Sequence, residues 1–178
     1  MTRSQNVAGA HGAAGRWSWW ATQAPPRPKP STVLIATAAS VAALVALVAV
    51  GRVTGEPLLI PPLAASMALV VGASNLPLGQ PRNVIGGQLV SAATGFVVLA
   101  VLGQGQWSAA IAGGLALGAM MLLRVPHSPA AATAVIVGAT APRVVSFLAL
   151  LAAATVILVL VGLVGNRFNK QEYPKYWW

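Results

Sequence analysis

Charged residues are almost absent from the middle of this chain. Between Lys29 and Arg167 the only charged side chains are Arg52, Glu56, Arg82, Arg124 and Arg143. Because a helix needs about 20 apolar residues to cross the ~30 Å hydrocarbon layer of a membrane, the gaps between these charges predict spanning helices at roughly 32–51, 84–102, 108–123 and 144–165. A chain with 57% hydrophobic and 7% charged residues is not an ordinary soluble domain. The predicted fold class is an all-α, polytopic integral membrane helix bundle.

Two shorter apolar segments resemble each other. The first begins Pro62-Leu-Ala-Ala-Ser66 and the second Pro129-Ala-Ala-Ala-Thr133, and each continues into Val-Gly-Ala followed by a hydroxyl residue. Proline suits the first turn of a helix, where its missing N–H is not needed. The pattern predicts two Pro-started helices of roughly 20 Å, too short to cross a bilayer unaided. It also predicts two similar units, about 32–102 and 108–165.

The two short helices leave two topologies open. If both are re-entrant, the chain crosses four times, and Arg52, Arg82, Arg124 and Arg143 all lie on the outer side. If both cross, the chain has six crossings and two three-helix units of opposite orientation, as in many transporters. The second arrangement moves Arg82 and Arg124 to the cytoplasmic side, and the positive-inside tendency favours it.

The two ends of the chain have a different composition from the membrane domain at 31–166. Residues 1–30 are rich in Gly, Ala, Ser and Pro and contain no acidic residue, which predicts a disordered basic tail with an interfacial anchor at Trp17–Trp20. Residues 167–178 form a second basic and aromatic tail. We therefore expect both termini at the cytoplasmic face of a bacterial plasma membrane. An organelle transit peptide is the alternative for the start, whereas a cleaved secretory signal is not expected.

Few residues are available for catalysis or for cofactors. The chain has no cysteine, and its only carboxylates are Glu56 and Glu172. Paired carboxylates for acid–base catalysis are therefore excluded, and no metal or other cofactor is predicted. The net charge of +9 is spread over tails and membrane edges, so no nucleic-acid partner is expected. We expect a protein that is not an enzyme.

The remaining polar features suit a small anion. Exposed N–H groups at the start of a helix carry partial positive charge, so helices starting at Pro62 and Pro129 would attract anions from a cavity. The hydroxyls of Ser66 and Thr133 either add hydrogen-bond donors there or bond to carbonyls of their own helices. His127 is the one group at the membrane edge that titrates near neutral pH, and its alternative role is structural.

Arginines accompany the ends of the short helices. Arg82, Arg124 and Arg143 either face a pore or extend to the headgroups. For Arg82 the neighbouring Gln80 and Asn83 favour function. The predicted anion-binding or pore-lining residues are Pro62, Ser66, Gln80, Arg82, Asn83, Arg124, His127, Pro129, Thr133 and Arg143.

Three motifs together resemble one family of membrane proteins. Pro62-Leu-Ala-Ala-Ser66, Gln80-Pro-Arg-Asn-Val-Ile-Gly-Gly-Gln-Leu-Val-Ser-Ala92 and His127-Ser-Pro-Ala-Ala-Ala-Thr-Ala134 are similar to the HPP family over roughly residues 32–165. The family's His-Pro-Pro is His127-Ser128-Pro129 here, so the middle proline is lost. The resemblance implies four spanning helices and, since some members in cyanobacteria and chloroplasts are implicated in nitrite transport, a nitrite substrate.

The sequence thus predicts a membrane transporter or channel for a small inorganic anion, nitrite foremost. Its expected partners are the anion, the lipid bilayer and further copies of the same chain, because a bundle of this size offers little interior of its own. The alternative is a non-transporting membrane subunit or scaffold that assembles with partner proteins.

Overall fold

The computed structural model describes residues 26–177, and every regular element within them is helical. The predicted aromatic anchor at Trp17–Trp20 and most of the predicted 1–30 tail lie outside the described residues. There are six α-helices and two 3₁₀ turns: α1 (Pro30–Thr54), α2 (Pro61–Gly72), η1 (Pro77–Gly79), α3 (Pro81–Leu102), α4 (Gln106–Leu122), η2 (Ser128–Ala130), α5 (Ala131–Thr140) and α6 (Val144–Phe168). The predicted all-α membrane bundle is confirmed.

The α-helices fall into two classes by length. By length and composition α1, α3 and α6 can each span a membrane, with 25, 22 and 25 residues. The predicted span at 108–123 is helix α4, whose 17 residues extend about 26 Å. It therefore belongs with the shorter apolar helices α2 and α5.

Prolines start several of these helices. Pro30, Pro61 and Pro81 occupy the first turns of α1, α2 and α3, where the absent N–H removes no intrahelical bond. The second short helix differs from the prediction, because Pro129 lies in the 3₁₀ turn η2 and α5 begins only at Ala131.

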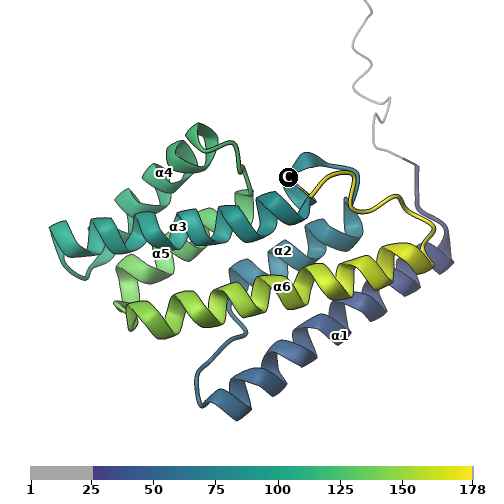
Figure 1. Cartoon of the computed structure of the whole chain (residues 1–178), viewed down its shortest axis with the longest axis horizontal. Coiled ribbons are helices and arrows are strands. Elements are labelled where there is room, and N and C mark those ends of the chain that lie inside the picture. Colours follow the sequence, from purple (N-terminus) through teal and green to yellow (C-terminus); the bar gives the residue numbers. More distant parts are fainter. Residues whose placement is uncertain (1–25, 178) are drawn as a thin grey trace, which may run out of the picture.

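The chain passes between two faces of the bundle at each helix (Figure 1). One end, called here the termini face, holds the start of α1, the α2–α3 connection (73–80), the α4–α5 connection (123–127) and the end of α6. Hydrogen bonds join Asn169 to the carbonyl of Thr32 and His127 to the carbonyl of Leu78 at this face. The other end, the Glu56 face, holds residues 55–60, 103–105 and 141–143. Glu56 pairs there with Arg143, and Gln104 donates to the carbonyl of Ala139.

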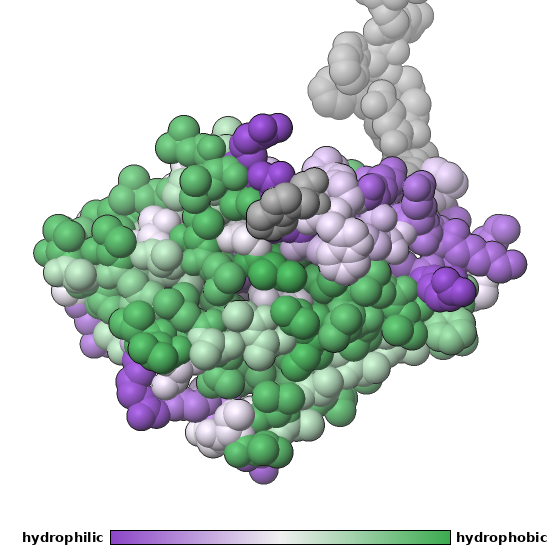
Figure 2. Space-filling view, in the orientation of Figure 1, coloured by the Kyte–Doolittle hydropathy of each residue, from purple (hydrophilic) through white to green (hydrophobic). Residues whose placement is uncertain are grey.

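The helices thus alternate in the order that the six-crossing arrangement requires, while the number of membrane crossings stays a prediction, because by length and composition only α1, α3 and α6 of the described helices can span a membrane. Arg82 and Arg124 lie at the termini face, and Arg52 and Arg143 lie at the Glu56 face. As the chain enters α2 from the Glu56 face and α5 from the termini face, these two helices run in opposite directions. Figure 2 shows a hydrophobic surface over the middle of the bundle and hydrophilic residues gathered at its two ends.

Two apolar clusters hold the bundle together. The larger joins α1, α2, α3 and α6 through residues such as Leu47, Met67 and Leu158, all fully buried. The smaller joins α3, α4 and α5. Helices of the second cluster approach closely, since a Cβ added at Gly138 would lie 2.8 Å from Ala109 Cα.

The C-terminal residues return across the termini face. After α6 ends at Phe168, the backbone N–H of Lys175 donates to Gln80 Oε1 at 2.8 Å. Tyr173 packs beside Gly162 of α6, and burial raises the pKa of its hydroxyl above the usual range. The tail therefore covers the α2–α3 connection.

Candidate functional site

A chain of buried, uncharged polar side chains lies where α2, α3 and α5 meet. Ser66, Gln88 and Thr133 are 0% exposed and His127 is 1% exposed. Buried polar groups are costly unless they are hydrogen-bonded. Every one of these four side chains has a partner.

Gln88 connects the two short helices. Its Nε2 donates to Ser66 Oγ of α2 at 3.0 Å, and its Oε1 accepts from the Thr133 hydroxyl of α5. Ser66 and Thr133 are the matching hydroxyls of the two similar segments. The structure therefore brings them to one site through a side chain that belongs to neither segment.

His127 closes the other end of this network. Its Nδ1 lies 2.7 Å from the carbonyl oxygen of Leu78, and its Nε2 lies 2.7 Å from Ser66 Oγ. Because a carbonyl can only accept, Nδ1 carries the hydrogen in this contact. Ser66 Oγ also lies 2.8 Å from the carbonyl of Pro62 in its own helix.

The absence of a side chain at Gly87 admits His127 to the bundle. A Cβ at Gly87 would lie 2.6 Å from His127 Cβ and 2.9 Å from the carbonyl oxygen of Val125. Such distances are too short for real atoms, so the α4–α5 connection reaches this depth only against a glycine. One turn further along α3, Ser91 donates to the carbonyl of Ala130 and fixes the start of α5.

A cavity of about 360 Å³ opens at the Glu56 face, between α2, α5 and α6. Its wall includes Leu63 and Ile136, which lie one helical turn from Ser66 and Thr133, on the Glu56 side of the network. Glu56 and Arg143 also line it.

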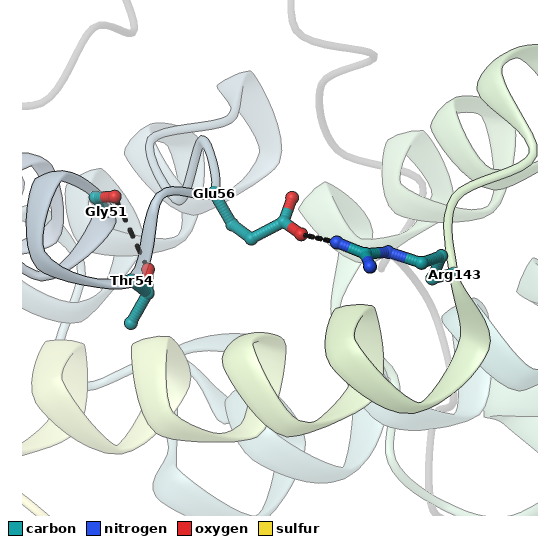
Figure 3. Close-up of polar contacts among 4 residues, drawn as sticks. All are labelled: Gly51, Thr54, Glu56 and Arg143. Atoms are coloured by element: carbon teal, nitrogen blue, oxygen red, sulfur yellow. Dashed lines mark hydrogen bonds and ion pairs between the residues drawn. The ribbon is translucent and has the colours of Figure 1, made fainter.

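The arginines do not enter the network. Arg143 pairs with Glu56 at the cavity rim (Figure 3), and its side chain is 81% exposed. Arg124 is exposed in the turn after α4, with φ of 60°. Arg82 is half-buried in the first turn of α3. Burying a charge in an apolar bundle is costly, which accounts for cations at the ends and neutral donors in the middle.

Gln80 and Asn83, predicted beside Arg82 as anion ligands, hold local structure. Gln80 Nε2 donates to the carbonyl of Ser74 at 2.7 Å, and Asn83 Nδ2 donates to that of Pro77 at 2.8 Å. Both also contact the C-terminal tail, at Lys175 and Tyr176. Their amides thus shape the α2–α3 connection and dock the tail.

Sequence reasoning missed Gln88 and Ser91 as site residues. A signal was present, since a glutamine in an apolar helix far from any charge needs a polar partner. Of the predicted residues, Ser66, His127 and Thr133 meet in the network, with Pro62 and Pro129 in the adjoining turns.

Comparison with known proteins agrees with these features. The HPP transmembrane region matches residues 25–174. A Dictyostelium discoideum protein described as a transmembrane protein is 34% identical over 139 residues, which is 71% of this chain and 45% of that relative. A second such protein from the same organism is 33% identical over 130 residues, 68% of this chain and 46% of the relative. The chain thus spans under half the length of these relatives. No solved structure matches it. Because the family's transmembrane region covers nearly all of the described helices, the chain belongs to the HPP family of integral membrane proteins.

Proposed function

We propose that this HPP-family protein is a transporter or channel for small monovalent inorganic anions, with nitrite as the foremost substrate. The observation that carries this proposal is the buried chain of neutral donors, Ser66, Gln88 and Thr133, at the meeting point of two short helices. Neutral donors bind an anion without the cost of a buried charge and release it again. A fixed arginine at that depth would hold it more tightly.

The proposed path begins in the cavity at the Glu56 face. Helix α2 starts beside this cavity with Pro61 and Pro62, which have no N–H, and the N–H of Leu63 donates to the Ile60 carbonyl. The positive charge that we propose at the entrance therefore comes from the dipole of α2 as a whole. The anion then passes Leu63 and Ile136 to reach the network, and leaves beside His127. A hydrophobic constriction followed by polar ligands is a common plan of selective membrane pores.

The charge distribution gives an orientation for this path. Among the described residues the termini face carries seven basic residues and one acidic residue, whereas the Glu56 face carries two basic and one acidic. By the positive-inside tendency we place the termini face in the cytoplasm.

Flux into reconstituted vesicles tests the function. Purified protein should carry nitrite at neutral pH faster than empty vesicles. Thr133→Val removes the hydroxyl without changing the shape of the side chain, and should reduce the flux. Thr155→Val is the matched control, since Thr155 is also fully buried but bonds within its own helix. No flux above empty vesicles for nitrite, nitrate, formate or chloride would end the proposal.

The second candidate is a non-transporting subunit that assembles with other proteins or with copies of itself. It is favoured by α4, where a Cβ added at Gly114 or Gly118 would meet nothing within 4 Å. Small residues on a free helix face allow close packing of a second membrane helix. Cross-linking from a cysteine at Gly114 would detect such a neighbour, and an absence of vesicle flux together with a stoichiometric partner would favour this role.

A further inference from the structure

The hydroxyl of Ser66 has more acceptors in reach than it can serve. It has one hydrogen, yet Oγ lies 2.7 Å from His127 Nε2 and 2.8 Å from the Pro62 carbonyl. Gln88 uses a lone pair of the same oxygen by donating to it at 3.0 Å. Where the Ser66 hydrogen points therefore depends on whether His127 Nε2 has a hydrogen of its own.

The contact with Leu78 restricts the protonation states of His127 to two. Since Nδ1 donates to the Leu78 carbonyl at 2.7 Å, the neutral imidazole has a bare Nε2 that accepts from Ser66. In the imidazolium Nε2 donates to Ser66 Oγ, and the hydroxyl turns to the Pro62 carbonyl, the other acceptor in its reach at 2.8 Å. Adding one proton to His127 thus reverses the Ser66–His127 hydrogen bond and moves the Ser66 hydrogen to a single acceptor, with which an anion can compete.

No carboxylate is available nearby to stabilise the imidazolium. Ser66, Leu78 and Gly87 contribute uncharged contacts from α2, η1 and α3. The titratable or charged side chains of the surrounding segments, as far as the structure describes them, are Arg82 in the first turn of α3, exposed Arg124 on the connection that carries His127, and Lys170, Glu172, Tyr173, Lys175 and Tyr176 of the C-terminal tail. The only acid among them, Glu172, is exposed in that tail. A bound anion would supply the missing negative charge.

We propose that the protein moves one proton together with each anion, with His127 as the proton site and Ser66 as the hydroxyl that couples the two. The proton binds Nε2 of His127, and the Ser66 hydroxyl then turns from the Pro62 carbonyl to the anion, where it joins the Thr133 hydroxyl and the Gln88 amide as a donor. Each ligand stabilises binding of the other, because the anion lowers the cost of the buried cation and the proton frees the Ser66 hydroxyl from His127. On exit Nε2 returns its proton to water, and the Ser66–His127 bond reverts.

This inference rests on the proposed anion transport, and the experiment separates the two. Vesicles containing the full chain and a trapped pH dye are given an inward nitrate gradient, because nitrate has no neutral acid that leaks through lipid at these pH values. The membrane potential is clamped with potassium and valinomycin. We expect equimolar entry of protons and nitrate, unaffected by the clamped potential, and faster as the pH on the entry side falls.

Variants sharpen the result. In His127→Asn the side-chain amide can still donate to Leu78 but cannot take up a proton, so proton entry should fall to the level of empty vesicles and any remaining nitrate flux should respond to the potential. His11→Asn, at the chain's other histidine, is the control and should behave as wild type. Nitrate flux without proton entry in the wild-type protein would overturn the coupling and leave anion transport standing. No wild-type flux of any anion would overturn the proposed function itself.

Discussion

The buried network around Gln88 and the Glu56–Arg143 ion pair both join segments that are distant in the sequence, but they differ in their exposure to solvent. The network side chains are at most 1% exposed, whereas the side chains of Arg143 and Glu56 are 81% and 35% exposed. A lost partner inside the bundle leaves a polar group that no water can satisfy. A lost partner at the surface is replaced by water. An ion pair near solvent can therefore contribute less to the free energy of unfolding than hydrogen bonds of neutral amides in the interior.

The largest effect is expected from Gln88→Leu. The substitution removes the acceptor for Thr133 and one donor to Ser66, which keeps its contacts with His127 and the Pro62 carbonyl. The orphaned Thr133 hydroxyl costs about 1–3 kcal/mol. We expect a clearly lower unfolding temperature in detergent and loss of anion flux. Gln104→Leu is the control, since Gln104 is exposed and bonds only the Ala139 carbonyl. An equal loss of stability in both variants would refute the contrast between interior and surface.

The second-largest loss of stability is expected from Gly87→Ala. Its new Cβ would lie 2.6 Å from His127 Cβ and 2.9 Å from the Val125 carbonyl oxygen, and overpacking of this kind costs about 1–3 kcal/mol. The displaced connection should also lengthen the His127–Ser66 contact. Gly114→Ala is the control on α4, where the added methyl meets open space and a helix gains up to about 1 kcal/mol from alanine. Thermal unfolding of the two variants should therefore shift in opposite directions, and a shared sign would contradict the packing at Gly87.

The difference between interior and surface also explains what could be predicted from the sequence. Long uncharged gaps placed the helices, because crossing a membrane dictates length and composition. The matching positions of Ser66 and Thr133 in two similar segments indicated that both belong to a site. Neither pattern could show that Gln88, from a third helix, joins them, since a contact between helices depends on their rotation and depth.

The sequence did not place the arginines, because an arginine avoids the cost of burial in hydrocarbon either by facing a pore or by extending to the headgroups. Sequence alone left Arg124 and Arg143 between a pore and the interface, and the structure puts both at the ends of the bundle, outside the network. Gln80 and Asn83 suggested ligands for an anion, but their partners are carbonyls of the α2–α3 connection and groups of the C-terminal tail. A returning tail leaves no periodic signal in the sequence.

A third prediction concerns the C-terminal tail, whose contact with Gln80 is intermediate in burial between the Gln88 network and the Glu56–Arg143 ion pair. Gln80→Leu removes the acceptor for the Lys175 N–H and the donor to Ser74. If the lost bonds contribute about 1.4 kcal/mol to docking, trypsin should cleave after Lys170 or Lys175 roughly tenfold faster in the folded protein. Gln171→Leu changes an exposed glutamine of the same tail and serves as control. Unchanged proteolysis in Gln80→Leu would mean that other contacts dock the tail.

The smallest change in stability is expected at the ion pair, where the two partners should be distinguishable by function. Glu56→Gln and Arg143→Gln should each alter the free energy of unfolding by less than about 1 kcal/mol, because exposed pairs rarely contribute more. Both residues line the cavity that we propose as the anion entrance. Removing the carboxylate makes that entrance more positive and should lower the KM for nitrite, whereas removing the guanidinium should raise it, by roughly two- to threefold in each case. Salt should weaken both effects, since solvent-exposed charges are screened over ~10 Å at 0.1 M ionic strength. Nitrite uptake by the two variants at low and high salt measures this, and a shift of KM in the same direction for both would mean that the anion does not enter past this pair.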